Sequence, residues 1–212
     1  QHYARDIFIK EDDGLLPAQD DDGTSIEPEY YAPAIPMILV NGSTGIGTGY
    51  SCCWPQHSPV QLIDYLLNQT QTLRPCFKGY SGTVVYDDNY NVISTGRWHR
   101  KNTNTIVITE LPAGVWTMTY KDWLEHPKQQ AWISKVTKDM STPSNIHFEV
   151  QVNNLSDEDV EKKFNLTKKL NIILTGFDTT GKIKTYANIK EVLDEWIPWR
   201  LELYEKRRLS MI

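Results

Sequence analysis

Cysteine is scarce in this chain of 212 residues, which holds three, with two of them adjacent at Cys52 and Cys53. So few cysteines cannot build a disulfide framework, and they favour a protein of a reducing compartment. Long apolar runs are missing too, because the longest, residues 35–40, contains Pro36 and is far too short to cross a membrane. No basic start followed by an apolar stretch indicates a signal peptide.

The common nucleotide and metal motifs are also missing. Glycine gathers at Gly42, Gly45, Gly47 and Gly49, but no lysine follows as in a P-loop, and the G-x-G-x-x-G order of a dinucleotide fingerprint is absent. The cysteines show no C-x-x-C spacing and the five histidines are scattered, so the sequence predicts no metal site.

Acidic charge dominates only the beginning of the chain. The formal net charge is −5, but residues 1–30 hold nine acidic and two basic residues, a net of −7. The remaining 182 residues hold 20 basic and 18 acidic residues, a net of +2. The acidic segment is either a solvated loop or a contact for a basic partner. The overall charge therefore does not exclude nucleic acid, whose phosphates are bound by Lys and Arg.

Basic residues gather in three places, and each group is either a solvated face or a nucleic-acid contact. The first group surrounds Trp98, the second lies between residues 162 and 169, and the third lies near the end of the sequence. Their members are Arg97, His99, Arg100 and Lys101; Lys162, Lys163, Lys168 and Lys169; and Lys206, Arg207 and Arg208.

Short β-rich runs separated by turn residues predict an α+β fold with mostly antiparallel strands. We expect strands at residues 82–86, 91–95, 105–108, 146–152, 170–177 and 182–186. Helices are expected from Ser58-Pro59, at residues 116–125, from Ser156 to about residue 163, and from Asn188 onward.

Three further segments are assigned from local signals. Residues 20–23 predict a turn-rich loop, and the apolar run at residues 37–40 predicts a strand or a buried extended segment. Pro198 falls inside the last expected helix. It should kink or split that helix, because proline removes a backbone donor and clashes with the preceding turn.

Ile46 is the most informative residue of the glycine-rich segment. It stands between Gly45 and Gly47, so no bulky neighbour lies beside it. If the segment is exposed, Ile46 projects as an isolated wedge of the kind that bends DNA by entering between base steps. Alternatively, the glycines make turns and Ile46 packs into the core. The residues alone leave both interpretations open.

Residues 27–51 carry a family resemblance. They read EPEYY and then, from Pro33, PAIPMILVNGSTGIGTGYS, which closely resembles the type IIA DNA topoisomerases, in particular their eukaryotic and large-DNA-virus branch. Further matches follow in order along nearly the whole chain, most weakly before Glu27. They are Phe77-Lys78-Gly79 with Gly82-Thr83, Glu110-Leu111-Pro112 with Trp116-Thr117 and Tyr120-Lys121, residues 182–186, and residues 200–207.

The resemblance implies a domain organisation. Residues 1–55 would be the end of a winged-helix domain, residues 56–187 a mixed α/β tower domain, and residues 188–212 the start of a coiled-coil helix. Pro198 departs from the uninterrupted helix of the family, so the start of the coiled-coil arm is left open.

The resemblance also implies an activity for the whole enzyme, an ATP-dependent type II topoisomerase that passes one duplex through a transient break in another. A tyrosine would form the covalent intermediate, and Mg²⁺ would stabilise the attacking and leaving oxygens. We expect the catalytic Arg-Tyr pair to precede Gln1, because Tyr3 does not align with it. The chain is expected to hold no catalytic residue, to bind neither Mg²⁺ nor ATP, and to be inactive alone.

By the same resemblance, double-stranded DNA is the expected partner, and the rest of the enzyme would form a homodimer, without membrane contact. Ile46, with Gly45 and Gly47, occupies the position of the isoleucine that intercalates in the family. A second DNA-binding stretch is expected at Asn165, Leu166, Thr167, Lys168, Lys169, Leu170 and Asn171, where lysines would contact phosphates. The protein would be nuclear in a cellular eukaryote, and in the host cytoplasm or virion for a large DNA virus.

An alternative hypothesis is a stand-alone DNA-binding or scaffolding module that uses this fold without catalysis. The residues before Gln1 in the full polypeptide distinguish the two, since an Arg-Tyr pair there supports the enzyme.

Overall fold

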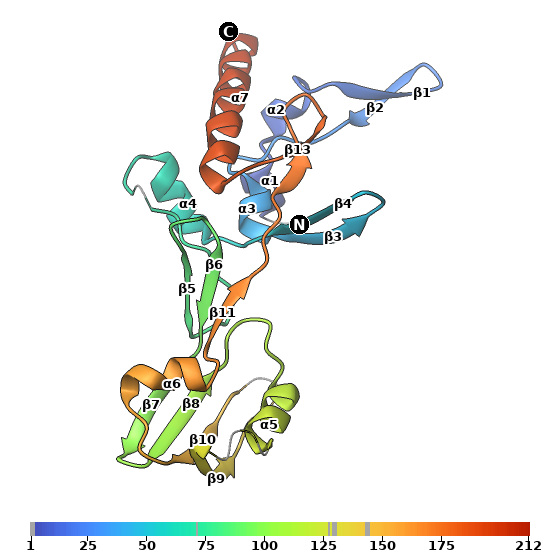
Figure 1. The fold of residues 1–212 in the computed structure, drawn as a ribbon. Helices are drawn as coiled ribbons and strands as arrows, with labels where there is room; N and C mark the ends of the chain where they lie inside the picture. Colours follow the sequence, from blue (N-terminus) through green and yellow to red (C-terminus); the bar gives the residue numbers. More distant parts are fainter. Residues whose placement is uncertain (1–2, 71, 127, 129–130, 143–144) are drawn as a thin grey trace. The chain divides into compact units, whose positions relative to one another are not determined.

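The computed structural model describes the chain except residues 1–2, 71, 127, 129–130 and 143–144 (Figure 1). It divides into two compact units. The first unit comprises Gln1–Leu73 and Ile172–Ile212, and the second unit comprises Arg74–Asn171. The fold is mixed α+β, as expected, and every strand pairing in the described residues is antiparallel. The division into winged-helix, tower and coiled-coil segments stays a prediction.

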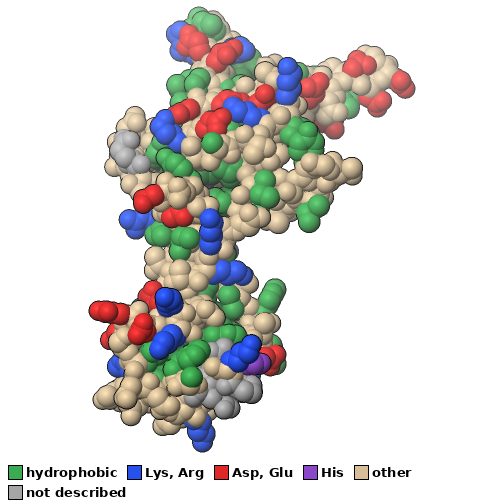
Figure 2. All heavy atoms as spheres, in the orientation of Figure 1, with side chains coloured by type: hydrophobic (Ala, Val, Ile, Leu, Met, Phe, Trp, Pro, Cys, Tyr) green, Lys and Arg blue, Asp and Glu red, His purple; other side chains and the backbone are tan. Residues whose placement is uncertain are grey.

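The first unit begins with two single-turn helices, α1 (Ala4–Ile7) and α2 (Lys10–Asp13), followed by a hairpin of β1 (Ala18–Asp21) and β2 (Thr24–Pro28). Asp22 and Gly23 connect the two strands with φ values of 49° and 83°. Positive φ at both positions is what a tight two-residue hairpin turn requires. The loop predicted at residues 20–23 is thus the end of a hairpin, and Figure 2 shows its acidic side chains exposed along it.

The next elements of this unit are α3 (Met37–Asn41), the hairpin of β3 (Ser43–Gly47) and β4 (Tyr50–Trp54), and α4 (Pro59–Leu66). The strand or extended segment predicted at residues 37–40 is wrong, because α3 is helical. Its single turn buries Leu39 completely while Ile38 stays 39% exposed. A run of four apolar residues has no periodicity that separates a short buried strand from one helical turn.

The first unit ends with a hairpin of β12 (Thr175–Phe177) and β13 (Ile183–Thr185) and with α7 (Ile189–Ser210). The single strand predicted at residues 170–177 is wrong, since one strand ends at Leu170 and β12 begins at Thr175. The helix α7 runs through Pro198 as one element, so the proline does not split it. Pro198 lies on an exposed face, where water can bond the carbonyl that proline leaves free.

A buried ionic network joins the beginning and end of the first unit. Arg200 on α7 donates from Nη2 to Oδ2 of Asp12 at 2.6 Å, and Arg207 reaches the other carboxylate oxygen at 3.2 Å. The ring of Tyr204 packs against both guanidinium groups, whose carbons are 4.1 and 4.8 Å from its centroid. Leu16, Ala32 and Leu203 form a small apolar cluster in the same unit.

The described residues of the second unit form two antiparallel sheets and two α-helices. One sheet has the order β11-β6-β5, and the other has the order β7-β8-β10-β9. The strands are β5 (Thr83–Tyr86), β6 (Val92–Thr95), β7 (Arg97–Asn102), β8 (Thr105–Glu110), β9 (Ile133–Asp139), β10 (Phe148–Val152) and β11 (Thr167–Leu170); the helices are α5 (Thr117–Glu125) and α6 (Asp157–Lys163). The strands β7 and β9 were not predicted.

The core of the second unit lies on the larger sheet. Alternate residues of β8 and β10, such as Ile106, Ile108 and Phe148, are fully buried, and both helices pack against them. Tyr120 of α5 donates its hydroxyl to the carbonyl of Phe164 at 2.7 Å, and burial raises the pKa of that phenol. This bond therefore ties α5 to the end of α6 within the core.

Candidate nucleic-acid interface

The β3–β4 hairpin presents Ile46 to solvent. In its register Gly45 pairs with Cys52, Ile46 with Ser51 and Gly47 with Tyr50. The side chain of Ile46 is 94% exposed, and the two glycines give it no flanking side chain. Of the two interpretations that the sequence leaves open, packing of Ile46 into the core is excluded. In the structure, Ile46 projects into solvent as an isolated apolar side chain.

The base of this hairpin is anchored inside the first unit. Trp54, at the end of β4, is buried, donates from Nε1 to the carbonyl of Thr175 at 2.8 Å, and packs edge-on against Tyr186. Cys53 and Ile173 exchange two backbone hydrogen bonds of 2.8 and 3.0 Å. The tip can therefore project while the base holds its position.

Gly42 makes the approach of β3 to this base possible. Its φ of 65° lies in the left-handed region, and a Cβ added there would lie 2.7 Å from the Trp54 carbonyl oxygen. Glycine is the residue that tolerates both conditions. The turn between α3 and β3 thus depends on the missing side chain.

A shallow groove of about 290 Å³ lies beside Ile46. Its lining includes Tyr50 from the hairpin and Phe177 and Ile183 from β12 and β13. All three side chains are substantially exposed, so the groove presents apolar surface to solvent. Exposed contiguous apolar surface of this kind marks an interaction site.

The second predicted DNA-binding stretch lies at the border of α6 and β11 in the second unit. The side chains of Asn165, Thr167, Lys168, Lys169 and Asn171 are exposed, and that of Leu170 is half-buried. Leu166 is completely buried in the core, so its side chain cannot reach a ligand in this structure. Lys168 donates to the carbonyl of Gly114 at 2.9 Å. DNA binding by the exposed members of this stretch stays a prediction.

The cluster around Trp98 is largely engaged within the protein. Arg100 contacts the Asp157 carboxylate at 2.6 Å and donates to the carbonyls of Leu155 and Thr103. Lys101 contacts Glu149 at 3.0 Å and lowers the pKa of that carboxyl. These contacts favour the interpretation as a structural, solvated face.

The other two groups of basic residues differ in whether their charges are paired with carboxylates. Near the end of the sequence, Lys206 and Arg208 form ion pairs with Glu202 and Glu205 at 2.8 and 2.6 Å. By contrast, Lys162, Lys163, Lys168 and Lys169 form no ion pair with any residue that the structure describes. Their charge is therefore free to meet phosphate.

The family resemblance implies Mg²⁺ and ATP for the whole enzyme, and it places no binding residue for either of them in this chain. Within the described residues, no group of three or more His, Cys, Asp or Glu side chains is placed to ligate a metal. Gly45 and Gly47 lie in a strand rather than in a loop that opens a helix, so they form no phosphate cradle. A search of the described residues also finds no helix with the length and apolarity of a membrane span.

Comparison with known proteins adds independent information. The family model for the A-type subunit of DNA gyrase/topoisomerase IV matches residues 1–212. The chain is 37% identical to "DNA topoisomerase 2, mitochondrial" of Dictyostelium discoideum over 97% of its own length and 17% of that protein's. It is 36% identical to "DNA topoisomerase 2" of Saccharomyces cerevisiae over 98% of its length and 16% of the relative's.

A solved structure agrees with these sequence matches. The crystal structure of the Plasmodium falciparum topoisomerase II DNA-binding, cleavage and re-ligation domain superimposes with a TM-score of 0.78 at 31% identity. The match covers 98% of this chain and 30% of that one. The chain therefore spans about a sixth of the length of the curated relatives described above.

Proposed function

Because the chain belongs to the type II DNA topoisomerase family, we propose that it binds and bends duplex DNA as part of the enzyme's DNA-binding, cleavage and re-ligation domain. The whole enzyme would pass one duplex through a transient break in another, using ATP, Mg²⁺ and a tyrosine nucleophile, and would act as a homodimer. This chain would supply the bend and part of the DNA-binding surface.

The observation that carries the proposal is the exposure of Ile46 at the tip of an anchored hairpin. Burying an isoleucine side chain gains about 1.5–3 kcal/mol, while unstacking a base step costs a few kcal/mol. The free energy gained by burying the wedge therefore roughly equals the free energy cost of unstacking the base step. The net gain has to come from additional contacts that bent DNA makes with the protein.

The lysines of β11 support such contacts. Lys168 and Lys169 lie on β11, and neither pairs with a carboxylate of the described residues. Each lysine that neutralises a phosphate contributes affinity without sequence preference and steepens the salt dependence of binding. Replacing either with glutamine should therefore weaken binding about equally for all sequences.

The test is the bend angle of a short duplex bound by the full-length enzyme carrying Ile46→Ala. End-to-end energy transfer between two dyes on the duplex should fall, because the wedge is lost. The unfolding midpoint should not change, since the side chain is exposed. The control is Val60→Ala, which removes a 67% exposed apolar side chain from α4 of the same unit. An Ile46→Ala enzyme that bends DNA as the wild type does would refute the proposal.

A further inference from the structure

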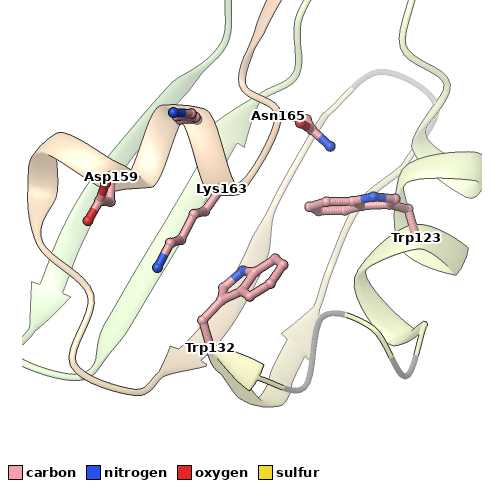
Figure 3. A pocket seen from close by; sticks show the side chains of 6 residues that line it. Trp123, Trp132, Asp159, Lys163 and Asn165 are labelled. Atoms are coloured by element: carbon pink, nitrogen blue, oxygen red, sulfur yellow. The ribbon is translucent and has the colours of Figure 1, made fainter.

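A pocket of about 430 Å³ lies in the second unit, between residues of α5, α6 and the start of β9 (Figure 3). Its lining consists of two tryptophans, two lysines, one carboxylate and one amide: Trp123, Trp132, Lys162, Lys163, Asp159 and Asn165. Of these, the two tryptophans and Asp159 have no part in the bending of duplex DNA proposed above. Aromatic faces next to free cations are the combination that binds nucleotides outside a duplex.

The two indoles offer fixed aromatic faces. Trp123 stacks on Tyr120 with a centroid distance of 5.3 Å and an interplanar angle of 29°. Trp132 lies immediately before β9, and its backbone carbonyl accepts a hydrogen bond from Asn153 at 2.9 Å. Both tryptophans are partly buried against the core of the second unit. In Figure 3 both rings lie below Asn165, and Lys163 lies to the left of Trp132.

Trp132 also carries an unused hydrogen-bond donor. Its Nε1 is buried and has no partner among the described residues. The flexible side chain of Lys163 lies over the same ring, with Nζ 5.9 Å from the centroid. If Lys163 turns toward an anion, the face of the Trp132 ring over which it lies becomes accessible to a base.

The charge of the pocket is positive on balance. Neither Lys162 nor Lys163 is ion-paired within the described part of the chain. The carboxylate of Asp159 accepts a hydrogen bond from Ser156 Oγ at 3.0 Å, and Figure 3 shows it directed away from the tryptophans. An anionic group is therefore accommodated on the lysine side, with a flat ring on the indole side.

We propose that this pocket binds an unpaired nucleotide of a single-stranded nucleic acid, with its base against the indoles and its phosphate at Lys162 and Lys163. A duplex fits less well, because its bases are paired and stacked and offer no free face. An acidic peptide matches the charge but brings no flat ring with acceptors at its edge. The pocket is separate from the Ile46 hairpin, so this inference does not depend on the bending function.

The experiment is fluorescence anisotropy of a labelled oligothymidylate, about ten nucleotides long, titrated with the 212-residue chain. Trp132→Leu removes one aromatic face and should weaken binding roughly tenfold. Trp132→Phe keeps a ring and should lose less. Lys163→Gln should reduce the slope of log affinity against log salt by about 1.

A matched control accompanies these variants. Lys135→Gln removes an exposed lysine of β9 outside the pocket and should bind the strand as the wild type does. Lys163 is exposed, so Lys163→Gln should fold normally even if a tryptophan variant does not. A duplex of the same length whose affinity falls as much in Trp132→Leu as the affinity of the strand does would overturn the proposal. So would displacement of the strand by polyglutamate at equal charge, or unchanged binding by both Trp132→Leu and Lys163→Gln.

Discussion

Asp12 and Arg200 are 188 positions apart in the sequence, yet the Nη2 of Arg200 lies 2.6 Å from Oδ2 of Asp12, and both side chains are buried. Two further nitrogens of Arg200, Nε and Nη1, have no hydrogen-bond partner among the described residues. The carboxylate of Asp12 is therefore the main compensation for a buried guanidinium. It connects α2 to α7 within the first unit.

Asp12→Ala should lower the free energy of unfolding by about 3–5 kcal/mol, because it leaves a buried charge without its partner. Denaturant unfolding at neutral pH measures this loss. The matched control is Asp13→Ala, whose ion pair with Arg5 is exposed at 56% and 26% of the two side chains. That variant should lose about 1 kcal/mol or less. Equal losses in both variants would contradict the assigned role.

Gly42→Ala should destabilise the base of the Ile46 hairpin by about 1–3 kcal/mol, because a left-handed φ and a close backbone oxygen both oppose the new methyl group. Thermal unfolding is the measurement. Gly45→Ala serves as control, since its φ is not in the left-handed region and the nearest atom to its Cβ would be Cys52 Sγ at 3.7 Å. A Gly42→Ala protein as stable as the Gly45→Ala protein would show that the turn relaxes freely.

Acid should destabilise the contact between the β12–β13 hairpin and α7. The Lys184 ammonium, 2.8 Å from Glu195, and the Thr179 N–H together lower the pKa of the Glu195 carboxyl. A lowered pKa contributes stability above the usual glutamate value of about 4.3, and this stability is lost as the pH falls toward the folded-state value. Glu195→Gln should therefore flatten the decline of stability below about pH 5.

The size of that effect is modest, because both partners are partly exposed and solvent screens them. The control is Glu158→Gln, at an exposed position of α6 in the second unit. It should keep the slope of the wild-type protein. A Glu195→Gln protein with the wild-type acid slope would show that the carboxylate is equally stabilised in the unfolded chain.

Elements with a strong local signal could be predicted from the sequence. The alternation of Phe148, Val150 and Val152 predicts β10, and Asn188 predicts the start of α7, where its side chain accepts from the Glu191 N–H at 3.0 Å. The strands β7 and β9 could not be found this way. Their residues are mostly charged or polar, and backbone pairing with the apolar strands β8 and β10 makes them strands.

The site was predictable in part. The sequence singles out Ile46 through its flanking glycines, but pairing register decides where it points. Trp54 pairs with Ser43, so it shares a face of the hairpin with the positions of Gly45 and Gly47, and Ile46 lies on the other face. In the second stretch, composition could not show that Leu166 belongs to the core while its neighbours are exposed.

The basic residues of β7 have a consequence for the solubility of the protein. The strands β7 and β9 are the outer strands of their sheet, and each leaves a row of backbone donors and acceptors without a strand neighbour in the described residues. Such edges invite pairing with another chain. Here one edge carries Arg97, Arg100 and Lys101 and the other carries Lys135 and Lys138. Charged side chains on an edge strand disfavour its pairing with another chain, so these residues of β7 and β9 oppose aggregation.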